Sequence, residues 1–433
     1  MTETYKFDVV VVGAGPAGCS VAYLLAKAGL RVLLVERGAE AGSKMLWGGK
    51  AYAQPIREVW PELDKEAPIH RWISKERFSI VWGERVLTLE YGLGRRVAFT
   101  TYLTELVAWM VKKAEEAGAL FIDKTRVDEI VVKDNRVIGV RSGSDVVEAD
   151  IVVDAEGVNR ILLEKLGLVP KLSPEQVGVG VKEVLKIDPK ILEERMGLSS
   201  NEGLSWLVVG DVTKGIPGGG FIYTMRDTLS IGLVLSVSSA IKAVEEDKLN
   251  THVSELLENF RTHPYFYKYW AEAEIIEYGG RLVPEANLKT MPKKLYYPGL
   301  LIVGDAGGFL VNAGYTFRGV DTAVYSGKLA AETILEAFNK KSFDDEVLKS
   351  YEDKIRRSYI YRELLNHKYI SNIMQDPFFF NEIPKLAMES IRKILEAEYE
   401  EPKIFNNIRE TMKENRIGLL KLLLKLTKVV RNV

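Results

Sequence analysis

Two glycine-rich turns, about 290 residues apart, carry the residue types with which proteins hold nucleotides. The first lies in "VVVVGAGPAGCSVAYLL", where Gly13, Gly15 and Gly18 give the spacing G-x-G-x-x-G. The second is "VGDAGGFLVNAGYTFRG" at residues 303–319, where an apolar run leads into Gly304 and Asp305. Both patterns are typical of a strand that ends at a phosphate or ribose site.

The first turn has a distinct task for each glycine. Gly13 permits the tight turn, Gly15 lets the backbone approach a pyrophosphate, and Gly18 allows close packing of helix on strand. Ala14, Pro16 and Ala17 complete the turn, and the helix that follows offers free N–H groups to the phosphates. A glycine turn without a ligand is the alternative, but the flanking strand and helix favour a dinucleotide site.

The end of the next strand helps to identify the nucleotide. Glu36, followed by Arg37, ends "RVLLVE" 18 residues after Gly18, where a carboxylate accepts hydrogen bonds from ribose hydroxyls. A carboxylate there disfavours a 2′-phosphate, so the sequence predicts NAD or FAD rather than NADP.

The second turn favours FAD over NAD. A dehydrogenase completes its nucleotide domain within about the first 150 residues, whereas this chain returns to a nucleotide-type strand near its end. We expect Asp305 to bind the ribityl chain, and the helix after Ala313 and Gly314 to direct its N-terminus at the flavin pyrimidine ring. The two turns then hold the two ends of one non-covalently bound FAD.

The elements that position these turns follow from the hydrophobic pattern. Residues 7–12 form an apolar run typical of a central parallel strand. We expect a loop over 38–60, a hairpin over 77–98, a helix over 99–117, mostly short strands over 175–290, and a helix over 316–339. Beyond residue 345 the pattern is helical. With 433 residues the chain is too long for a single core, so two or three domains are expected.

Composition excludes several other functions. Lys and Arg number 59 against 60 Asp and Glu, so nucleic acid is not an expected partner. Cys19 is the only cysteine, so this chain alone cannot hold a Cys-ligated iron–sulfur cluster, and we expect Cys19 to fill the core. The presence of only four histidines argues against a His-rich metal site, and no acid–base catalytic residue is identified. We expect no secretion leader, and no apolar run is long enough to span a bilayer. The chain has few Gln beside many Lys and Glu, a composition that suggests a thermophile.

The whole arrangement resembles the glutathione-reductase-like flavoproteins of the p-hydroxybenzoate hydroxylase type. Their middle motif, Asp-Gly at a strand end, has its counterpart in "IVVDAEGVNR", which adds Ala155, Glu156 and Gly157, together with Val127, to the expected FAD contacts. Their arginine before the third helix matches Arg96, for which an ordinary surface charge is the alternative.

That resemblance implies the fold class α/β plus α+β: a Rossmann FAD domain assembled from discontinuous segments, a mixed β-sheet substrate domain and a C-terminal helical region. We expect the FAD domain to take residues 1–75, 99–170 and 290–345. The substrate domain takes 76–98 and 171–289, and the helical region takes 346–433.

Five stretches resemble one branch, the electron-transfer-flavoprotein:quinone oxidoreductases in their short FixC/EtfC form. They are "WGGKAY", "VGVGVKEV", "IPGGGFIYTMRDTLSIGLV", "GGRLVPE" and "VGDAGGFLVNAGYTFRGVD". The resemblance implies electrons arriving from electron-transfer flavoprotein α and β subunits, passing through FAD and the iron–sulfur cluster of a separate FixX/EtfX-type subunit, and reaching a membrane quinone. Whether the donor complex bifurcates electrons from NADH is left open.

For the quinone we expect a site at Gly218, Gly219, Gly220 and Phe221, because glycine lets a flat ring approach the backbone. A β-turn or bulge at these glycines is an equal alternative. Trp47, Gly48 and Gly49 are expected to line the isoalloxazine, with core packing the alternative for Trp47.

The tail "RIGLLKLLLKLTKVVRNV" predicts a basic amphipathic helix over 416–431. Its lysines would meet anionic head groups while its leucines enter the lipid, which attaches a cytoplasmic protein to the inner face of the membrane; docking on its own domain is the alternative. Three other functions stay open: a geranylgeranyl-reductase-like flavoprotein that saturates isoprenoid double bonds, a soluble aromatic hydroxylase, and a non-catalytic electron-relay scaffold.

Overall fold

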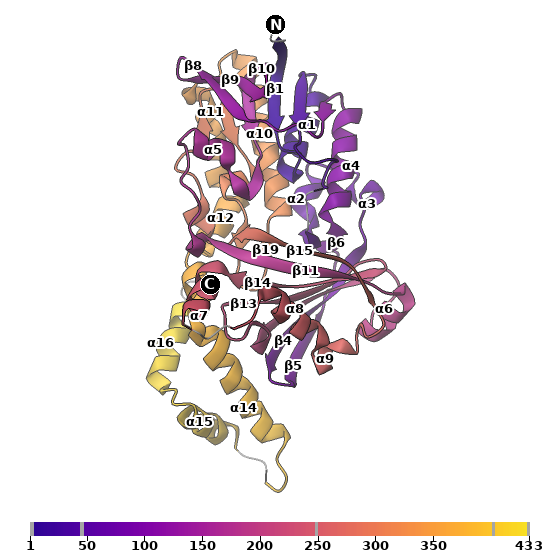
Figure 1. Ribbon diagram of the computed structural model, residues 1–433, viewed down its shortest axis with the longest axis vertical. Helices are drawn as coiled ribbons and strands as arrows, with labels where there is room; N and C mark the ends of the chain where they lie inside the picture. The colour runs from indigo at the N-terminus through magenta and orange to yellow at the C-terminus, as the bar shows by residue number, and fades with distance from the viewer. Residues whose placement is uncertain (1–3, 44–46, 247–249, 401–402, 431–433) are drawn as a thin grey trace.

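The computed structural model describes residues 4–43, 47–246, 250–400 and 403–430, with side chains as far as residue 427. The molecule is elongated (Figure 1). A sheet that contains the N-terminal strand lies at one end, a second sheet lies in the middle, and helices of the C-terminal region form the other end.

The first sheet combines segments that are far apart in the chain. Its strands are β1 (Thr4–Val12), β2 (Val32–Val35), β7 (Leu120–Ile122), β8 (Glu129–Lys133), β9 (Arg136–Ser142), β10 (Asp145–Asp154), β16 (Tyr296–Tyr297) and β17 (Leu300–Ile302). The order is β16-β17-β10-β1-β2-β7, with β9 beside β10 and β8 beside β9. The five strands from β17 to β7 in this order are parallel, as expected for the apolar run at 7–12.

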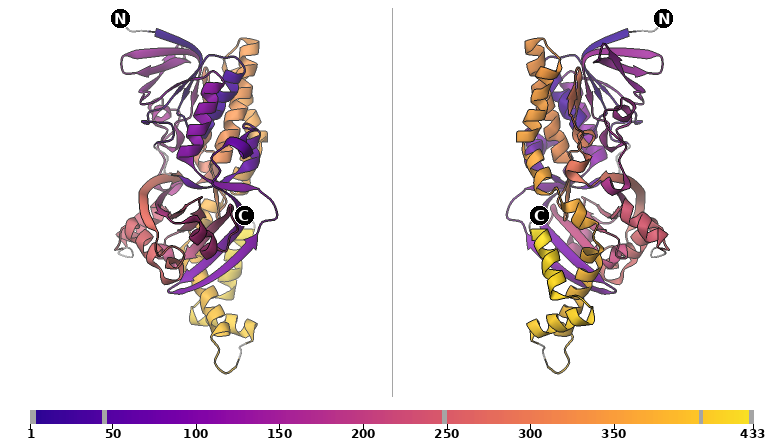
Figure 2. Two further views of the ribbon diagram at one scale, coloured as in Figure 1. Left: turned by 90° about the vertical axis from the view of Figure 1, so that its right-hand side faces the viewer. Right: turned by 90° about the vertical axis from the view of Figure 1, so that its left-hand side faces the viewer.

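Helices cover one face of this sheet as a second layer (Figure 2). They are α1 (Pro16–Lys27), α4 (Leu103–Glu116) and α10 (Val320–Lys340). Successive side chains of a strand point to opposite faces, so Val9 and Val11 of β1 join the core under these helices. Val10 and Val12 join a separate core on the other face, together with residues of β8, β9 and α5 (Ile161–Lys165).

The second sheet forms the middle of the molecule. Its strands are β3 (Gly48–Tyr52), β4 (Arg71–Trp82), β5 (Arg85–Gly92), β6 (Ala98–Tyr102), β11 (Val177–Lys186), β12 (Glu202–Gly210), β13 (Gly218–Thr224), β14 (Thr228–Ser236) and β15 (Glu274–Pro284). The order is β15-β11-β14-β13-β12-β4-β6-β3, with β5 beside β4. One face packs on α6 (Pro189–Met196), α8 (Val253–Thr262) and α9 (Pro264–Tyr267), while α7 (Val237–Glu245) follows β14 directly.

The remaining helices connect the sheets or form the C-terminal end. They are α2 (Ala53–Arg57), α3 (Leu63–Glu66), α11 (Asp345–Arg357), α12 (Tyr359–Asn366), α13 (Ile370–Met374), the π-helical η6 (Phe378–Glu382), α14 (Ile383–Leu395), α15 (Ile404–Glu414) and α16 (Leu419–Val430). Among the residues described, no helix is long and apolar enough to cross a bilayer.

The mixed fold class and the helical C-terminal region are confirmed, and so is the hairpin within 77–98, where β4 pairs with β5. Three local expectations are wrong. The supposed loop 38–60 contains β3 and α2, the segment 99–117 begins as β6 before α4, and α10 begins at residue 320 rather than 316. The strands were missed because β3 and β6 are short, and their glycines and threonines become strand only by pairing with each other and, for β6, with β4. The domain boundaries stay a prediction, and strand pairing assigns β3 and β6 to the second sheet.

The tail forms a helix as predicted, but its lysines face the protein. Lys421 lies 2.8 Å from Glu382, and Lys425 pairs with Asp376. The expectation that these lysines meet lipid head groups is therefore wrong, because acidic side chains of the same chain already neutralise them. The side chain of residue 428 lies outside the described part.

The leucines of α16 divide between two environments. Leu422 packs in a small core with residues of the C-terminal region, so the expectation that it enters lipid is also wrong. The other leucines of this helix are exposed, namely Leu419, Leu420, Leu423, Leu424 and Leu426. The exposed face of α16 is thus apolar rather than basic.

Candidate functional site

The carboxyl ends of three parallel strands bring the distant turns together. In the register of the first sheet, Val12 of β1 lies beside Asp154 of β10, which lies beside Ile302 of β17. The backbone continues the match: Ala155 N donates to Val12 O at 2.9 Å, and Val303 N donates to Asp154 O at 3.0 Å. The first, middle and second turns therefore start from one edge, where ligands of such sheets bind.

The first turn has the geometry of a phosphate cradle. Gly13 has φ +104°, and a Cβ there would lie 2.5 Å from Ala155 O, so only glycine fits this turn. Gly15 is the N-cap of α1 and supplies no side-chain cap, which leaves the first N–H groups of the helix available to a ligand. At Gly18 a Cβ would lie 2.0 Å from Gly13 O, so this glycine permits the packing of α1 on the sheet.

Glu36 is held in a fixed position at the end of β2. Its carboxylate accepts hydrogen bonds from Ala14 N at 3.1 Å and from Gly38 N at 2.7 Å. These two backbone donors orient the carboxylate beside the cradle, and its remaining acceptor capacity suits the hydroxyls of a ribose. The N–H donors at the start of α1 and the acceptor oxygens of Glu36 therefore fit the adenosine diphosphate half of FAD.

Asp305 lies in η5 (Gly304–Gly307), directly after β17. Burial raises the pKa of the Asp305 carboxyl to about 6, and the positive charges of Arg281 and Arg160 work in the opposite direction. Gly304 has φ +61°, and its N–H donates to Ser326 Oγ at 3.0 Å, so α10 anchors this turn. This partly buried carboxylate lines the pocket and is suited to accept hydrogen bonds from a polyol chain.

The middle motif has Glu156 where the Asp-Gly motif of the related flavoproteins has aspartate, and this glutamate has a structural role. Glu156 caps α5, since its carboxylate accepts a hydrogen bond from Leu162 N at 2.9 Å. Asp154 is fully buried, and one of its oxygens, Oδ2, has no partner. Burial, together with the nearby Glu156, raises the pKa of the Asp154 carboxyl. Gly157 has φ +77°, and a Cβ there would meet nothing within 4 Å, so its backbone conformation alone favours glycine.

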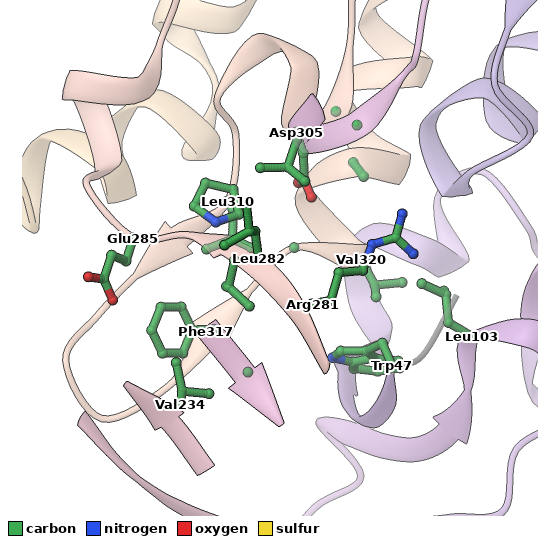
Figure 3. A pocket seen from close by; sticks show the side chains of 18 of the residues that line it. Trp47, Leu103, Val234, Arg281, Leu282, Glu285, Asp305, Leu310, Phe317 and Val320 are labelled. Carbon is green, nitrogen blue, oxygen red and sulfur yellow. The ribbon is translucent and has the colours of Figure 1, made fainter. Parts of the chain in front are cut away.

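One pocket of about 1080 Å³ joins these turns to the second sheet (Figure 3). Its volume is at the upper end of the roughly 300–1,000 Å³ typical of small-molecule sites, as expected for a site that holds a ligand as large as a dinucleotide. The predicted cofactor residues that line it are Gly13, Gly15, Pro16, Ala17, Glu36, Arg37, Trp47, Gly48, Val127, Ala155, Glu156, Gly157, Gly304, Asp305, Ala313 and Gly314.

Four predicted residues do not line this pocket. Ala14 and Gly18 lie behind it, with Ala14 N bonded to Glu36 as described, and Gly49 is buried next to Trp47. Arg96 lies elsewhere: it is exposed, and its guanidinium lies 5.6 Å from the centre of the Trp72 ring. The segment before β6 runs along the outside of the second sheet, which keeps Arg96 away from the cofactor pocket.

The segment after Gly314 differs from the expected helix start. A small hairpin, β18 (Val311–Asn312) and β19 (Phe317–Arg318), comes first, and α10 starts at Val320. Arg318 forms an ion pair with Asp321 at 2.6 Å, and Tyr359 Oη donates to the same carboxylate at 3.2 Å. This buried pair fixes the first turn of α10, whose N-terminal residues Gly319 and Val320 line the pocket.

The second sheet forms the floor of the pocket, where one row of cross-strand neighbours contains two glycines. Gly219 of β13 pairs with Val234 of β14, Val234 pairs with Gly180 of β11, and Gly180 pairs with Arg281 of β15. We call these four residues the glycine row. A Cβ at Gly180 would have ordinary contacts, its nearest neighbour being 3.5 Å away, so packing does not require glycine there.

The predicted quinone residues Gly218, Gly219, Gly220 and Phe221 all line this pocket, and they form strand β13 rather than a turn. Packing accounts for three of them: a Cβ at Gly218 would lie 2.1 Å from Val234 O, one at Gly219 would lie 2.8 Å from Val208 O, and one at Gly220 would lie 3.2 Å from the Phe260 ring. Gly219 and Phe221 share the pocket face of the strand.

The pocket extends from the floor toward the C-terminal helices. Apolar side chains line this end, from β12, β14, β19, α13, η6 and α14: Leu207, Val209, Val234, Phe317, Ile373, Met374, Phe379, Phe380 and Ile383. The pocket thus has a polar end at the first sheet and an apolar end at the C-terminal region.

Sequence reasoning missed seven charged residues of this pocket. Three of them, Arg126, Asp128 and Lys165, lie near the expected contact Val127 or on α5, and the other four are Lys50, Lys182, Arg281 and Glu285. Lys50 is buried and pairs with Glu76 at 2.9 Å, and Lys182 is buried with Glu277 at 3.3 Å. Lys50, Lys182, Arg281 and Glu285 lie in stretches that carried the family resemblance, which was the available signal, but no local pattern marks them as pocket residues.

Cys19 is fully buried and its thiol donates to Ala14 O at 3.4 Å, while burial raises its pKa far above the usual range. This is the environment of a core residue rather than of a reactive thiol. Within the described ranges, no group of three His, Cys, Asp or Glu side chains is placed to hold a metal ion.

Comparisons with known proteins agree with this geometry. The model of the family "FAD dependent oxidoreductase" matches residues 8–80 and 49–333. The "Probable electron transfer flavoprotein-quinone oxidoreductase YdiS" of Escherichia coli K12 is 35% identical over 394 residues, which cover 90% of each chain. "Protein FixC" of Escherichia coli O157:H7 is 34% identical over 422 residues, 96% of this chain and 97% of that protein.

Two solved structures share the fold at low identity. A geranylgeranyl bacteriochlorophyll reductase-like protein from Thermoplasma acidophilum has a TM-score of 0.71 at 19% identity, covering 98% of this chain and 100% of that one. The myxobacterial FAD-dependent halogenase CndH has a TM-score of 0.66 at 19% identity, covering 96% and 98%.

Proposed function

Because the chain belongs to the FAD-dependent oxidoreductases, and among them to the electron transfer flavoprotein–quinone oxidoreductases of the FixC type, we propose that it passes electrons from an electron-transfer flavoprotein through FAD to a quinone. The observation that carries the proposal is the single pocket that joins a dinucleotide cradle to an apolar end of the second sheet. A cofactor site with a second, apolar compartment suits a redox partner with a hydrophobic tail.

FAD supplies the redox chemistry when it is bound, and the protein supplies position and electrostatics. In this proposal the N–H groups at the start of α1 bind the pyrophosphate, and Glu36 accepts hydrogen bonds from the ribose. Asp305 accepts hydrogen bonds from the ribityl chain, and Trp47 and Gly48 flank the ring system. The start of α10, fixed by Arg318 and Asp321, lies at the ring end of the cofactor.

We place the quinone ring over the glycine row of the second sheet. The bare backbone at Gly180 and Gly219 lets a flat ring approach the floor, and Phe221 borders it on the same face. The isoprenoid tail would follow the apolar side chains toward η6 and α14. The tail then leaves the pocket at the C-terminal end of the molecule.

Exposed apolar side chains gather on the C-terminal helices, which form this end of the molecule (Figure 1). Leu419, Leu420, Leu423 and Leu424 of α16 are half or more exposed, as are Leu395 at the end of α14 and Phe405 near the start of α15. We propose that this face attaches the protein to the inner membrane surface, by insertion of apolar side chains more than by charge.

The electron donor and an intermediate carrier complete the proposal. An electron-transfer flavoprotein of α and β subunits delivers the electrons. A separate small ferredoxin-like subunit holds an iron–sulfur cluster, since Cys19 alone cannot. Isolation of the native complex and identification of its subunits tests both partners.

The experiment for the function itself uses the recombinant chain with FAD bound and chemically reduced without oxygen. Stopped-flow mixing with a short-chain quinone should reoxidise the flavin and yield quinol. Mixing with an unsaturated prenyl lipid should leave the flavin reduced and the double bonds intact. Saturation of the prenyl lipid without quinone reduction would instead support the geranylgeranyl-reductase-like alternative.

A further inference from the structure

Glu285 is a buried carboxyl at the apolar end of the pocket. It follows β15 directly, is 6% exposed, and lines the same pocket as Asp305 and Trp47. In the close-up it lies on the same side of the pocket as Phe317 and Val234, and on the opposite side from Trp47 and Leu103 (Figure 3). A carboxyl among apolar side chains is costly unless it has a task or a partner.

The register of the second sheet places this carboxyl close to the glycine row. One same-face step along the strands from that row, Ser236 of β14 pairs with Gly178 of β11. A Cβ at Gly178 would lie 2.8 Å from Glu285 Oε2, so the carboxyl lies directly over Gly178. Same-face neighbours on a strand are about 7 Å apart. A ring that covers Gly180 and extends toward Gly178 is therefore within reach of Glu285, directly or through one water.

Two serines connect Glu285 with the outside of the sheet. Ser236, which is 3% exposed, has its hydroxyl close enough to the Glu285 carboxyl to act on its pKa. Its Oγ lies 3.3 Å from Ser238 Oγ, and Ser238 belongs to α7 and is half-buried. Hydroxyls both donate and accept, so this row of oxygens can pass a proton between the surface and the carboxyl.

We propose that Glu285 delivers a proton to the quinone, and that Ser236 and Ser238 return a proton from solvent to Glu285. This inference rests on the proposed function and adds to it the source of a proton. It makes Glu285 a catalytic residue and the two serines positioning residues of the relay.

The step balances as follows. A quinone becomes a quinol by gaining two electrons and two protons. Anionic reduced FAD gives up two electrons and one proton on returning to oxidised FAD, so one further proton is needed. The Glu285 O–H bond breaks, an O–H bond forms at a quinone oxygen, and the electron pair of the broken bond stays on the carboxylate. A solvent proton then restores the acid through the serines.

The surroundings of Glu285 set the expected pH dependence. Burial raises its pKa to about 7, and the nearby Ser236 hydroxyl works in the opposite direction. The packed elements carry Glu175 on η2 (Pro174–Gln176), Arg281 on β15, Lys289 on η4 (Asn287–Thr290), Lys182 and Glu183 on β11, and Lys242 and Glu245 on α7. Because the acid form is the proton donor, quinone reduction should slow as the pH rises above about 7.

The test compares two electron acceptors for each variant, loaded with FAD and reduced. Quinone takes up protons, whereas ferricenium takes only an electron. Glu285→Gln should slow quinone reduction at least about 100-fold, as loss of a general acid does, and should abolish the decline at high pH. Its ferricenium rate should equal that of wild type. Glu285→Asp should retain part of the quinone rate, and Ser236→Ala should slow it without changing flavin content.

A matched control and a spectroscopic readout complete the design. Glu175→Gln changes an exposed carboxyl close to the same strand end and should leave both rates unchanged. Infrared pH titration of wild type should show a carboxyl that titrates near pH 7 and is missing in Glu285→Gln.

The possible results separate the proton role of Glu285 from the proposed electron transfer to quinone. Unchanged quinone kinetics and pH profile in Glu285→Gln would overturn the proton role and leave the proposed function in place. Equal slowing with both acceptors would also overturn it, since the defect would then lie in electron transfer. If wild type reduces ferricenium but no quinone, the proposed function fails and this inference fails with it.

Discussion

Replacement of Asp305 by asparagine should stabilise the FAD-free protein and weaken its binding of FAD. Burial raises the pKa of this carboxyl from 3.8 to about 6, so the folded protein prefers the neutral acid. About two pKa units correspond to about 3 kcal/mol of lost stability at pH 7. Asparagine has nearly the same shape and no charge, and should recover up to this amount.

The effect on FAD has the opposite sign. If Asp305 accepts hydrogen bonds from the ribityl chain as we propose, its charge contributes about 1.5–3 kcal/mol to binding. The dissociation constant of FAD should then rise roughly 10-fold to 150-fold in Asp305→Asn. Thermal unfolding of the FAD-free proteins and titration with FAD measure the two effects separately.

The pH dependence follows from the direction of the pKa shift. Below about pH 4 the carboxyl is neutral in both the folded and the unfolded state, and the penalty is absent. The penalty grows between pH 4 and 6 and is complete above that range. The difference in melting temperature between variant and wild type should therefore be largest at pH 7 and shrink as the pH falls through about 6.

A matched control has the reverse electrostatics. Arg31 lies 2.7 Å from Asp8, and although burial acts to raise the pKa of Asp8, the contacts with Arg31 lower it on balance. Asp8→Asn should thus slightly destabilise the protein and leave FAD affinity unchanged. A destabilised FAD-free Asp305→Asn, or an unchanged FAD affinity, would refute our reasoning about Asp305.

Three further predictions follow from the same structure. Gly13→Ala should lose FAD, because its Cβ would lie 2.5 Å from Ala155 O. Gly29→Ala is the control for backbone strain, since Gly29 has φ +88° and its Cβ would meet nothing within 4 Å. Full flavin absorbance in Gly13→Ala would contradict the phosphate cradle. Replacement of Leu420 and Leu424, which are 71% and 62% exposed, by serine should reduce co-sedimentation with vesicles at low and high salt alike. Burial of a leucine side chain in lipid contributes about 1.5–3 kcal/mol to membrane binding. Unchanged sedimentation would remove α16 from the membrane proposal. The recombinant chain alone should contain flavin without stoichiometric iron, and a full cluster in it would defeat the separate iron–sulfur subunit.

The sequence by itself determined the features that depend on neighbouring residues. The spacing of Gly13, Gly15 and Gly18 between an apolar strand and a helix is a local pattern, and so is the position of Glu36 at the end of the next strand. The return to an apolar strand before Asp305 indicated a second contact with the same cofactor. These features sufficed to predict FAD, and the resemblance of the whole arrangement to known flavoproteins implied the fold class.

Tertiary structure decided everything that depends on partners distant in the chain. Only the register of β1, β10 and β17 brings Gly13, Ala155 and Gly304 to one edge, and only acidic side chains some 40 to 50 residues away turn Lys421 and Lys425 toward the protein. The same holds for Glu285, which reads in the sequence as an ordinary charge after a strand. Its burial over Gly178, which raises its pKa, arises from packing between strands about 100 residues apart, and a local pattern carries no information about such packing.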